Sequence, residues 1–230
     1  CIRDSFNCAR WDGGLAEIKT IELSGFDAIP TGEFVKQCKF MGRLARMCVL
    51  FTGGSLRCVD FSSSFQVTQT YDISNGDVVS GISSGSSSTS SPFVVAVLES
   101  GTLEMVNRYQ YPNVVPISGL PASSPIVKVA FQLPALFYAV TADGKAYHCS
   151  LDTSTGVCGS VTEISPTNVD TFQKSYPDLL GEAIDVFADT HEYTAFTFGG
   201  ALLNDGTIRA WGRTNYGSDG DNNGNICAIG

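Results

Sequence analysis

Charge is scarce in this chain, and basic charge is the scarcer kind. Only 16% of the 230 residues are charged, and 14 Lys and Arg stand against 23 Asp and Glu, for a net charge of −9. A protein that binds nucleic acid or an anionic membrane needs a positive surface to displace counterions. The composition therefore argues against both as partners. So few charges also indicate surfaces covered by a protein partner, by copies of the chain itself or by glycans.

Several segments that define other classes of protein are missing as well. No apolar run approaches the roughly 20 residues that span a bilayer, so membrane insertion is not expected. No signal peptide is visible, and a chain that begins at Cys1 is interpreted as already processed or trimmed. No Asn-x-Ser/Thr acceptor occurs, which argues against N-glycosylation.

Cysteine, in contrast, occurs eight times and never in the Cys-x-x-Cys spacing of zinc ribbons and dithiol redox motifs. An even number of widely spaced cysteines favours disulfides formed in an oxidising compartment, with free buried thiols as the alternative. We therefore expect a secreted, extracellular or cell-surface protein. The eight cysteines are Cys1, Cys8, Cys38, Cys48, Cys58, Cys149, Cys158 and Cys227.

One pattern recurs five times: an apolar run, a tight turn with glycine, and an alternating strand. Asp-Gly or Gly-Gly between apolar alternations is a strong hairpin signal, because such turns need positive φ. The turn glycines are separated by 40, 47, 43 and 62 residues, which is typical of one four-stranded propeller blade per repeat. The hairpins lie near 8–18, 48–58, 95–105, 138–149 and 200–211, and their turn glycines are Gly14, Gly54, Gly101, Gly144 and Gly206.

We therefore predict an all-β fold, a β-propeller-like array of about five four-stranded antiparallel blades that makes residues 1–230 one domain. A lone hairpin is marginal in water, so each one must pack on further strands. The long last interval is explained by an insertion near 162–181. The array is either a compact five-bladed ring or part of a longer propeller. The glycine-rich stretch that ends at Gly230 favours the second.

The last repeat has a recognisable sequence. Residues 201–217, ALLNDGTIRAWGRTNYG, resemble the repeat of the regulator-of-chromosome-condensation family, and residues 183–196 resemble the strand and His-containing turn before it. The second repeat, with a Cys on each side of its turn, resembles the extracellular, disulfide-bonded branch of that superfamily. The resemblance implies a propeller but no single function, since its members include chromatin-bound exchange factors, a secreted inhibitor and receptor ectodomains. Acidic charge and disulfides argue against the chromatin-bound branch.

Alignment on the turn glycines predicts two disulfides. Cys48 and Cys58 face each other across one hairpin, where Cβ atoms lie close to the separation that a disulfide requires. Cys149 and Cys158 flank a second plausible tight bend at 152–156 and are predicted to pair as well.

The other four cysteines are not assigned. Cys8 aligns with Cys48, but the position opposite is expected to be Ile18, so its partner lies elsewhere. The pairing of Cys8 with Cys1, Cys38 or Cys227 leaves three connectivities. A bond from Cys227 to the N-terminal region would close a ring, and a bond to a neighbouring chain is the alternative.

The one ligand motif is near the C-terminus. Asp219, Asp221 and Asn223 occupy positions 1, 3 and 5 of a calcium-loop pattern, so calcium is the only cofactor considered. The bidentate Glu of that pattern would fall at or beyond the end of the chain, and an acidic, glycine-rich blade loop is the other interpretation. No catalytic residue is predicted, because His191 falls where the resembled repeat has a turn histidine.

The run from Ser83 to Ser91 is expected to form a flexible loop, with O-glycans on its hydroxyls as a functional alternative. Three functions remain. We expect a non-catalytic extracellular module for protein–protein recognition or assembly, because variable loops on rigid blades suit binding. The alternative is a structural subunit of an extracellular filament, sheath or appendage, and a secreted enzyme on a propeller scaffold comes third.

Overall fold

The structure is a computed structural model, and it contains only strands and their connections in the part that it describes. It describes residues 5–10, 17–22, 32–40, 46–61, 67–72, 79–86, 92–107, 114–121, 123–132, 136–169, 175–190 and 197–212, with the backbone alone in 5–10, 17–22 and 67–72. Over these ranges, no helix has the length and apolar character needed to cross a membrane.

The strands form five antiparallel sheets, each of which is one blade. The first blade contains β1 (Ser5–Arg10) and β2 (Glu17–Glu22). The second contains β3 (Val35–Phe40), β4 (Arg46–Phe51), β5 (Leu56–Phe61) and β6 (Val67–Asp72). The third contains β7 (Val79–Ser86), β8 (Pro92–Leu98), β9 (Leu103–Asn107) and β10 (Val114–Ile117). The fourth contains β11 (Ile126–Gln132), β12 (Leu136–Thr141), β13 (Ala146–Asp152) and β14 (Val157–Glu163), and the fifth β15 (Ala183–Thr190), β16 (Thr197–Leu203) and β17 (Ile208–Gly212).

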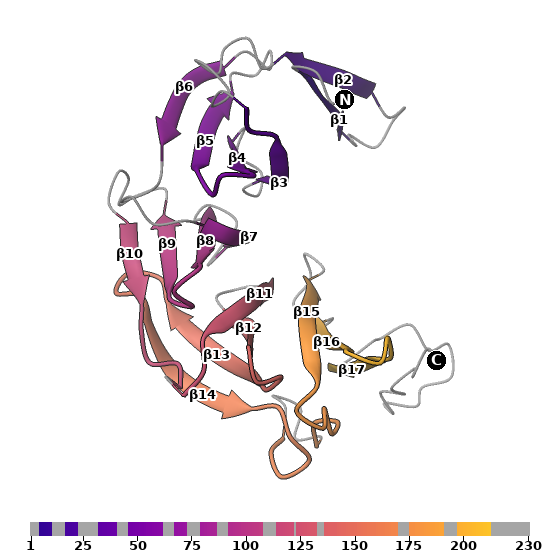
Figure 1. Ribbon diagram of the computed structural model, residues 1–230. Coiled ribbons are helices and arrows are strands. Elements are labelled where there is room, and N and C mark those ends of the chain that lie inside the picture. The colour runs from indigo at the N-terminus through magenta and orange to yellow at the C-terminus, as the bar shows by residue number, and fades with distance from the viewer. Residues whose placement is uncertain are drawn as a thin grey trace.

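The blades follow one another along an arc (Figure 1). The strands β3, β7, β11 and β15 lie on its concave side, and we call them the inner strands. The all-β, β-propeller-like fold is confirmed, and each of the five expected hairpins is a pair of adjacent strands. Three blades have four strands; among the described residues the fifth has three and the first has two.

Turn glycines hold each blade to the next. Gly54, Gly101, Gly144 and Gly206 all have positive φ, between 78° and 87°, as their turns require. The carbonyl oxygen of Gly54 accepts the N–H of Val79, at 3.0 Å, and this contact recurs one and two blades later. The later pairs are Gly101 with Ile126, at 3.1 Å, and Gly144 with Ala183, at 3.0 Å. Each donor is the first residue of the next inner strand, while Gly14 lies outside the described residues.

The hydrophobic core is divided among the blade interfaces. One buried cluster joins the second blade to the third, another the third to the fourth, and another the fourth to the fifth. Trp211, which is 4% exposed, belongs to the last cluster and meets the ring of Tyr138 edge-on at 5.2 Å. Stability therefore depends on neighbouring blades covering each other.

Each inner strand carries a β-bulge at its second residue. Pairing with the next strand shifts by one residue after Val35, Val79, Ile126 and Ala183 in the four blades. A bulge turns the residues that follow it and increases the local twist. It therefore sets the direction in which the third residue of each inner strand points.

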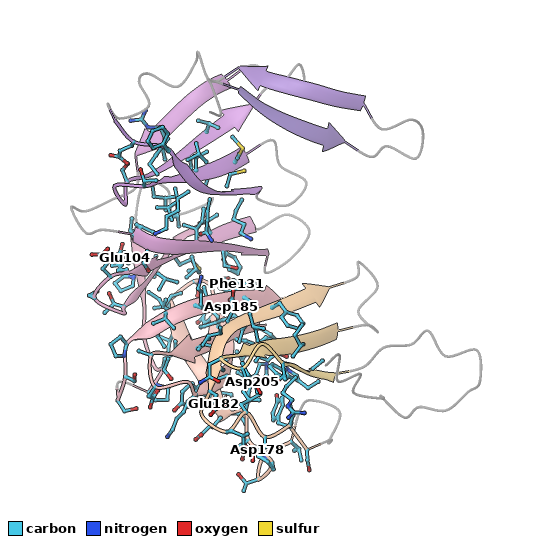
Figure 2. The ribbon with its side chains drawn as sticks, turned by 45° about the vertical axis from the view of Figure 1, so that its right-hand side comes forward. Glu104, Phe131, Asp178, Glu182, Asp185 and Asp205 are labelled. Carbon is cyan, nitrogen blue, oxygen red and sulfur yellow. A yellow bond between two sulfur atoms is a disulfide. The ribbon has the colours of Figure 1, made fainter. Side chains whose placement is uncertain are left out.

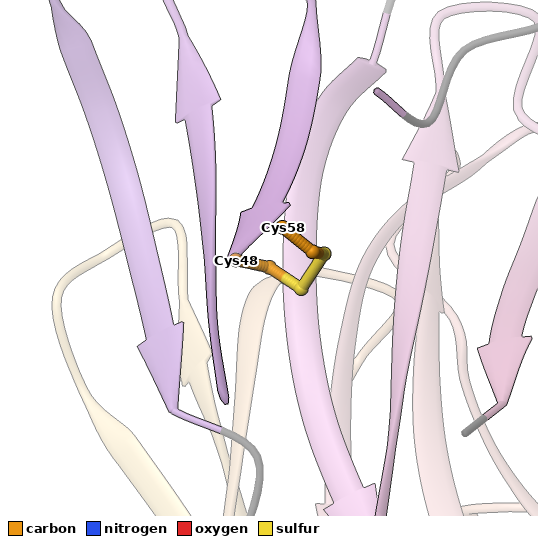
Figure 3. Close-up of a disulfide and its surroundings, with 2 residues drawn as sticks. All are labelled: Cys48 and Cys58. Atoms are coloured by element: carbon orange, nitrogen blue, oxygen red, sulfur yellow. A yellow bond between two sulfur atoms is a disulfide. The ribbon is translucent and has the colours of Figure 1, made fainter. Parts of the chain in front are cut away.

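The structure joins Cys48 to Cys58 (Figure 3) and Cys149 to Cys158, the two pairs predicted from the sequence. Cys48 and Cys58 are direct partners in the β4–β5 register. The prediction that Ile18 lies opposite Cys8 is wrong, because the β1–β2 register pairs Cys8 with Lys19 and Ile18 with Ala9. The connection between Arg10 and Glu17 is one residue longer than the alignment assumed, and a one-residue change shifts every pair.

Candidate functional site: a groove lined by the inner strands

The inner strands of four successive blades line a groove with a volume of about 380 Å³. Its position on the concave side of the arc follows from the fold, since β3, β7, β11 and β15 all face that side (Figure 1). The lining residues are Gln37, Lys39, Gly81, Ile82, Ser83, Val97, Val127, Lys128, Val129, Ala130, Phe131, Asp185, Val186, Phe187 and Ala188. Propeller-type folds present side chains from several blades at such a position, so it is the candidate binding site.

Equivalent positions bring different chemistry into this groove. The residue directly after the bulge is Gln37, Gly81, Lys128 or Asp185 in the four inner strands, in chain order. At one level of the array, the groove is therefore lined by an amide, by glycine backbone, by an ammonium group and by a carboxylate. Lys39, two residues after Gln37, adds a second positive charge to the lining.

Two of these polar groups are fixed by backbone contacts. The side-chain oxygen of Gln37 accepts the N–H of Ile82 at 2.9 Å, so it bridges the second blade to the third. Oδ1 of Asp185 accepts the N–H of Val186 at 2.8 Å. A backbone hydrogen bond limits the rotamers of a side chain, so both groups are positioned before any ligand arrives.

Aromatic packing holds one residue of the groove wall, Phe131, in place. Phe131 packs edge-on against Phe93 at 4.9 Å between ring centroids and lies 5.1 Å from the ring of Phe137. Phe131 and Asp185, which Figure 2 labels, come from adjacent blades and both line the groove. The groove therefore offers apolar surface and charge of both signs.

The sequence did not identify these groove residues. The four residues after the bulges share no sequence motif. What they share is a position, two residues after the first residue of an inner strand. That offset becomes visible only when the bulge and the turn-to-strand contact are known.

The residues singled out from the sequence lie elsewhere. Asp219, Asp221, Asn223 and His191 fall outside the described residues, so the calcium prediction and the interpretation of His191 stay predictions. In the described ranges, no group of three or more His, Cys, Asp or Glu is placed to hold a metal ion.

The expectation of a loop from Ser83 to Ser91 is wrong at its beginning. β7 continues to Ser86, and Ser83 pairs with Val95 of β8. Ser83 is only 8% exposed and lines the groove, so it is not available to a glycan. The strand continues because Ser and Thr tolerate an extended backbone when a partner strand supplies hydrogen bonds. Residues 87–91 lie outside the described residues.

Carboxylates at three turns have lowered pKa values. A hydrogen bond from the side chain of Ser154 is the main cause that lowers the pKa of Asp152 to about 2. The hydroxyl of Thr141 lowers the pKa of Asp143, and the N–H of Thr207 lowers that of Asp205. All three are fully exposed and serve their own turns, so they are structural groups.

The comparisons with known proteins concern the fold alone. No family model matches the chain, and no curated protein matches it in sequence. Among solved structures it is similar to the one titled "Crystal structure of BBS1N in complex with ARL6DN, soaked with mercury", with 8% sequence identity and a TM-score of 0.51. The match covers 80% of this chain and 53% of that chain, so this chain spans about half the length of its neighbour. BBS1N is a β-propeller, which supports the propeller-like fold described above.

Proposed function

We propose that this protein is a secreted or cell-surface module that recognises a protein partner in the groove and acts by binding rather than by catalysis. The observation that carries the proposal is the change in chemistry at one repeat position, where Gln37, Gly81, Lys128 and Asp185 face the groove from four blades. Rigid strands that present different side chains at equivalent positions suit specific recognition.

Two further observations support this proposal. The two disulfides are typical of proteins that fold in an oxidising compartment. The structural neighbour BBS1N was crystallised in complex with a protein, ARL6DN, so a fold of this kind accommodates protein partners. Within the same proposal, residues 201–217 belong to an extracellular form of the regulator-of-chromosome-condensation repeat.

The test uses one pair of matched charge reversals on the fourth blade. Lys128 lines the groove, whereas Lys145 is an exposed lysine in the turn between β12 and β13. The wild-type chain, Lys128→Glu and Lys145→Glu are each measured against an array of purified extracellular proteins by biolayer interferometry. We expect a partner whose affinity falls about tenfold or more with Lys128→Glu, as for a charge at an interface core, and is unchanged by Lys145→Glu.

A partner that loses affinity equally with both variants, or with neither, would contradict the groove as the binding site. Thermal unfolding of both variants provides the control, since an exposed lysine contributes little to stability. A loss of binding by Lys128→Glu with an unchanged melting temperature would assign the effect to the interface.

A second function, assembly into an extracellular structure, is favoured by one separate observation. Leu202 and Ile208 of the fifth blade are only half-buried, although their repeat equivalents in earlier blades are buried by the next blade. An uncovered blade face can bind another copy of the chain. Light scattering of the wild type and of Leu202→Asp tests this, because assembly through that face requires the wild type to associate and the variant to be monomeric.

A further inference from the structure

Two positions of the repeat lie in or against one buried cluster at each of the three interfaces from the second blade to the fifth. The first is the residue six before the turn glycine, in the strand that follows the inner strand, and we call it the middle-strand position. The second is the residue three after the start of the next inner strand, and we call it the inner-strand position. The pairs are Cys48 with Ile82, Val95 with Val129, and Tyr138 with Val186, and each pair shares one buried cluster.

Contacts between strands explain why these positions coincide. Strand β4 contacts β7, β8 contacts β11, and β12 contacts β15, so the second strand of a blade lies against the first strand of the next. The turn-to-strand hydrogen bonds from Val79, Ile126 and Ala183 fix the register of each contact. The same pair of positions is therefore brought together three times by the same geometry.

In the first two blades, the residues at these two positions are both cysteines. Cys8 lies in β1, six residues before Gly14, and Cys38 lies in β3, three residues after Val35. The hairpin of the first blade offers Cys8 no cysteine of its own, since Lys19 stands opposite.

Cys38 lies on the face of the second blade that points away from the third blade. It is the register partner of Val49 in β4, and its Sγ donates to Sδ of Met47 at 3.8 Å. Met47 and Val49 are fully buried, yet neither belongs to the core shared with the third blade. In both views the β1–β2 hairpin stands at that end of the second blade (Figures 1 and 2).

We propose that Cys8 and Cys38 form a third disulfide, which joins the first blade covalently to the second. The two thiols lose two protons and two electrons as the S–S bond forms. A small-molecule disulfide such as oxidised glutathione accepts them by thiol–disulfide exchange and is released as two thiols. The bonds Cys48–Cys58 and Cys149–Cys158 each join neighbouring strands of one sheet. The proposed bond would instead join two different sheets.

Tryptic mapping without reduction tests the bond directly. The full chain is produced in a secretory host, alkylated at low pH to block exchange, and digested. Cleavage after Lys and Arg places Cys8 in peptide 4–10, DSFNCAR, and Cys38 in peptide 37–39, QCK, while Cys1 and Cys227 fall in other peptides. We expect one species with the summed mass of 4–10 and 37–39 that separates into its two parts on reduction.

Alkylated 37–39, or a link from 4–10 to the peptide of Cys1 or Cys227, would overturn the proposal. Cys8→Ser supplies the second readout. If the bond exists, this variant exposes a thiol that alkylation locates at Cys38, and the Cys48–Cys58 peptide pair is unchanged. If Cys38 is equally alkylated in the wild type and in Cys8→Ser, the two residues are not partners.

Discussion

The fourth and fifth blades carry nearly the same turn, and only one of the two turns is covered. Gly144 and Gly206 both follow an Asp, with φ values of 78° and 86°. A Cβ atom on Gly144 would overlap the backbone of Gly181 at the start of the fifth blade, whereas one on Gly206 would meet none of the described residues within 4 Å. The difference shows that the turn glycine has two separate roles. It permits the turn, and it lets the next blade approach.

The apolar face beside the turn shows the same contrast. The residue four before the turn glycine is fully buried in the second and fourth blades, at Leu50 and Val140, but half-buried at Leu202. The residue two after it is buried at Leu56 and Leu103 and half-buried at Ile208. Burial at these positions is thus supplied by the following blade and not by the hairpin itself.

The largest expected effect separates the two roles of glycine. Gly144→Ala combines a positive φ with a backbone overlap, so we expect it to lower the free energy of unfolding by about 3 kcal/mol or more. Gly206→Ala introduces only the strain of an alanine in the left-handed conformation, so we expect it to lower the free energy of unfolding by about 1 kcal/mol. Urea denaturation of both variants measures the difference. Equal losses would mean that the contact with Gly181 contributes nothing.

A pair of leucines at one repeat position gives the next effect. Leu50→Ala removes a fully buried side chain between two blades, and we expect a loss of about 2–5 kcal/mol. Leu202→Ala removes a half-buried one, with an expected loss of about 1 kcal/mol. The same denaturation experiment compares them. A loss at Leu202 as large as at Leu50 would indicate that the fifth blade is covered after all.

The smallest effect concerns the carboxylates directly before Gly144 and Gly206. Asp143 and Asp205 have lowered pKa values in the fold, so their contribution is present above the ordinary pKa of 3.8 and is lost as pH falls through the lower folded value. Asp143→Asn and Asp205→Asn should each reduce the fall in melting temperature below pH 4 by a similar, small amount. A clearly larger effect at Asp143 would show that the carboxylate also serves the blade interface.

The repeat and its turns could be predicted because their signals are local. Gly54 and Gly101 were identified as turn glycines since Gly-Gly and Ser-Gly interrupt apolar alternation, and the same alignment placed Cys48 opposite Cys58. The groove could not be predicted, because Lys128 and Asp185 come together only when separate inner strands lie side by side. The residue opposite Cys8 was misplaced by one position, because the alignment assumed a connection one residue shorter than the one between Arg10 and Glu17.

The carbonyl-to-amide contacts from Gly54 to Val79, Gly101 to Ile126 and Gly144 to Ala183 couple each blade only to its neighbour. In statistical terms the arc is a one-dimensional chain of nearest-neighbour couplings, as in repeat proteins. Through these three bonds the third and fourth blades are each held to a neighbour on both sides. We therefore expect the slowest hydrogen exchange in the third and fourth blades, whose inner strands β7 and β11 line the groove.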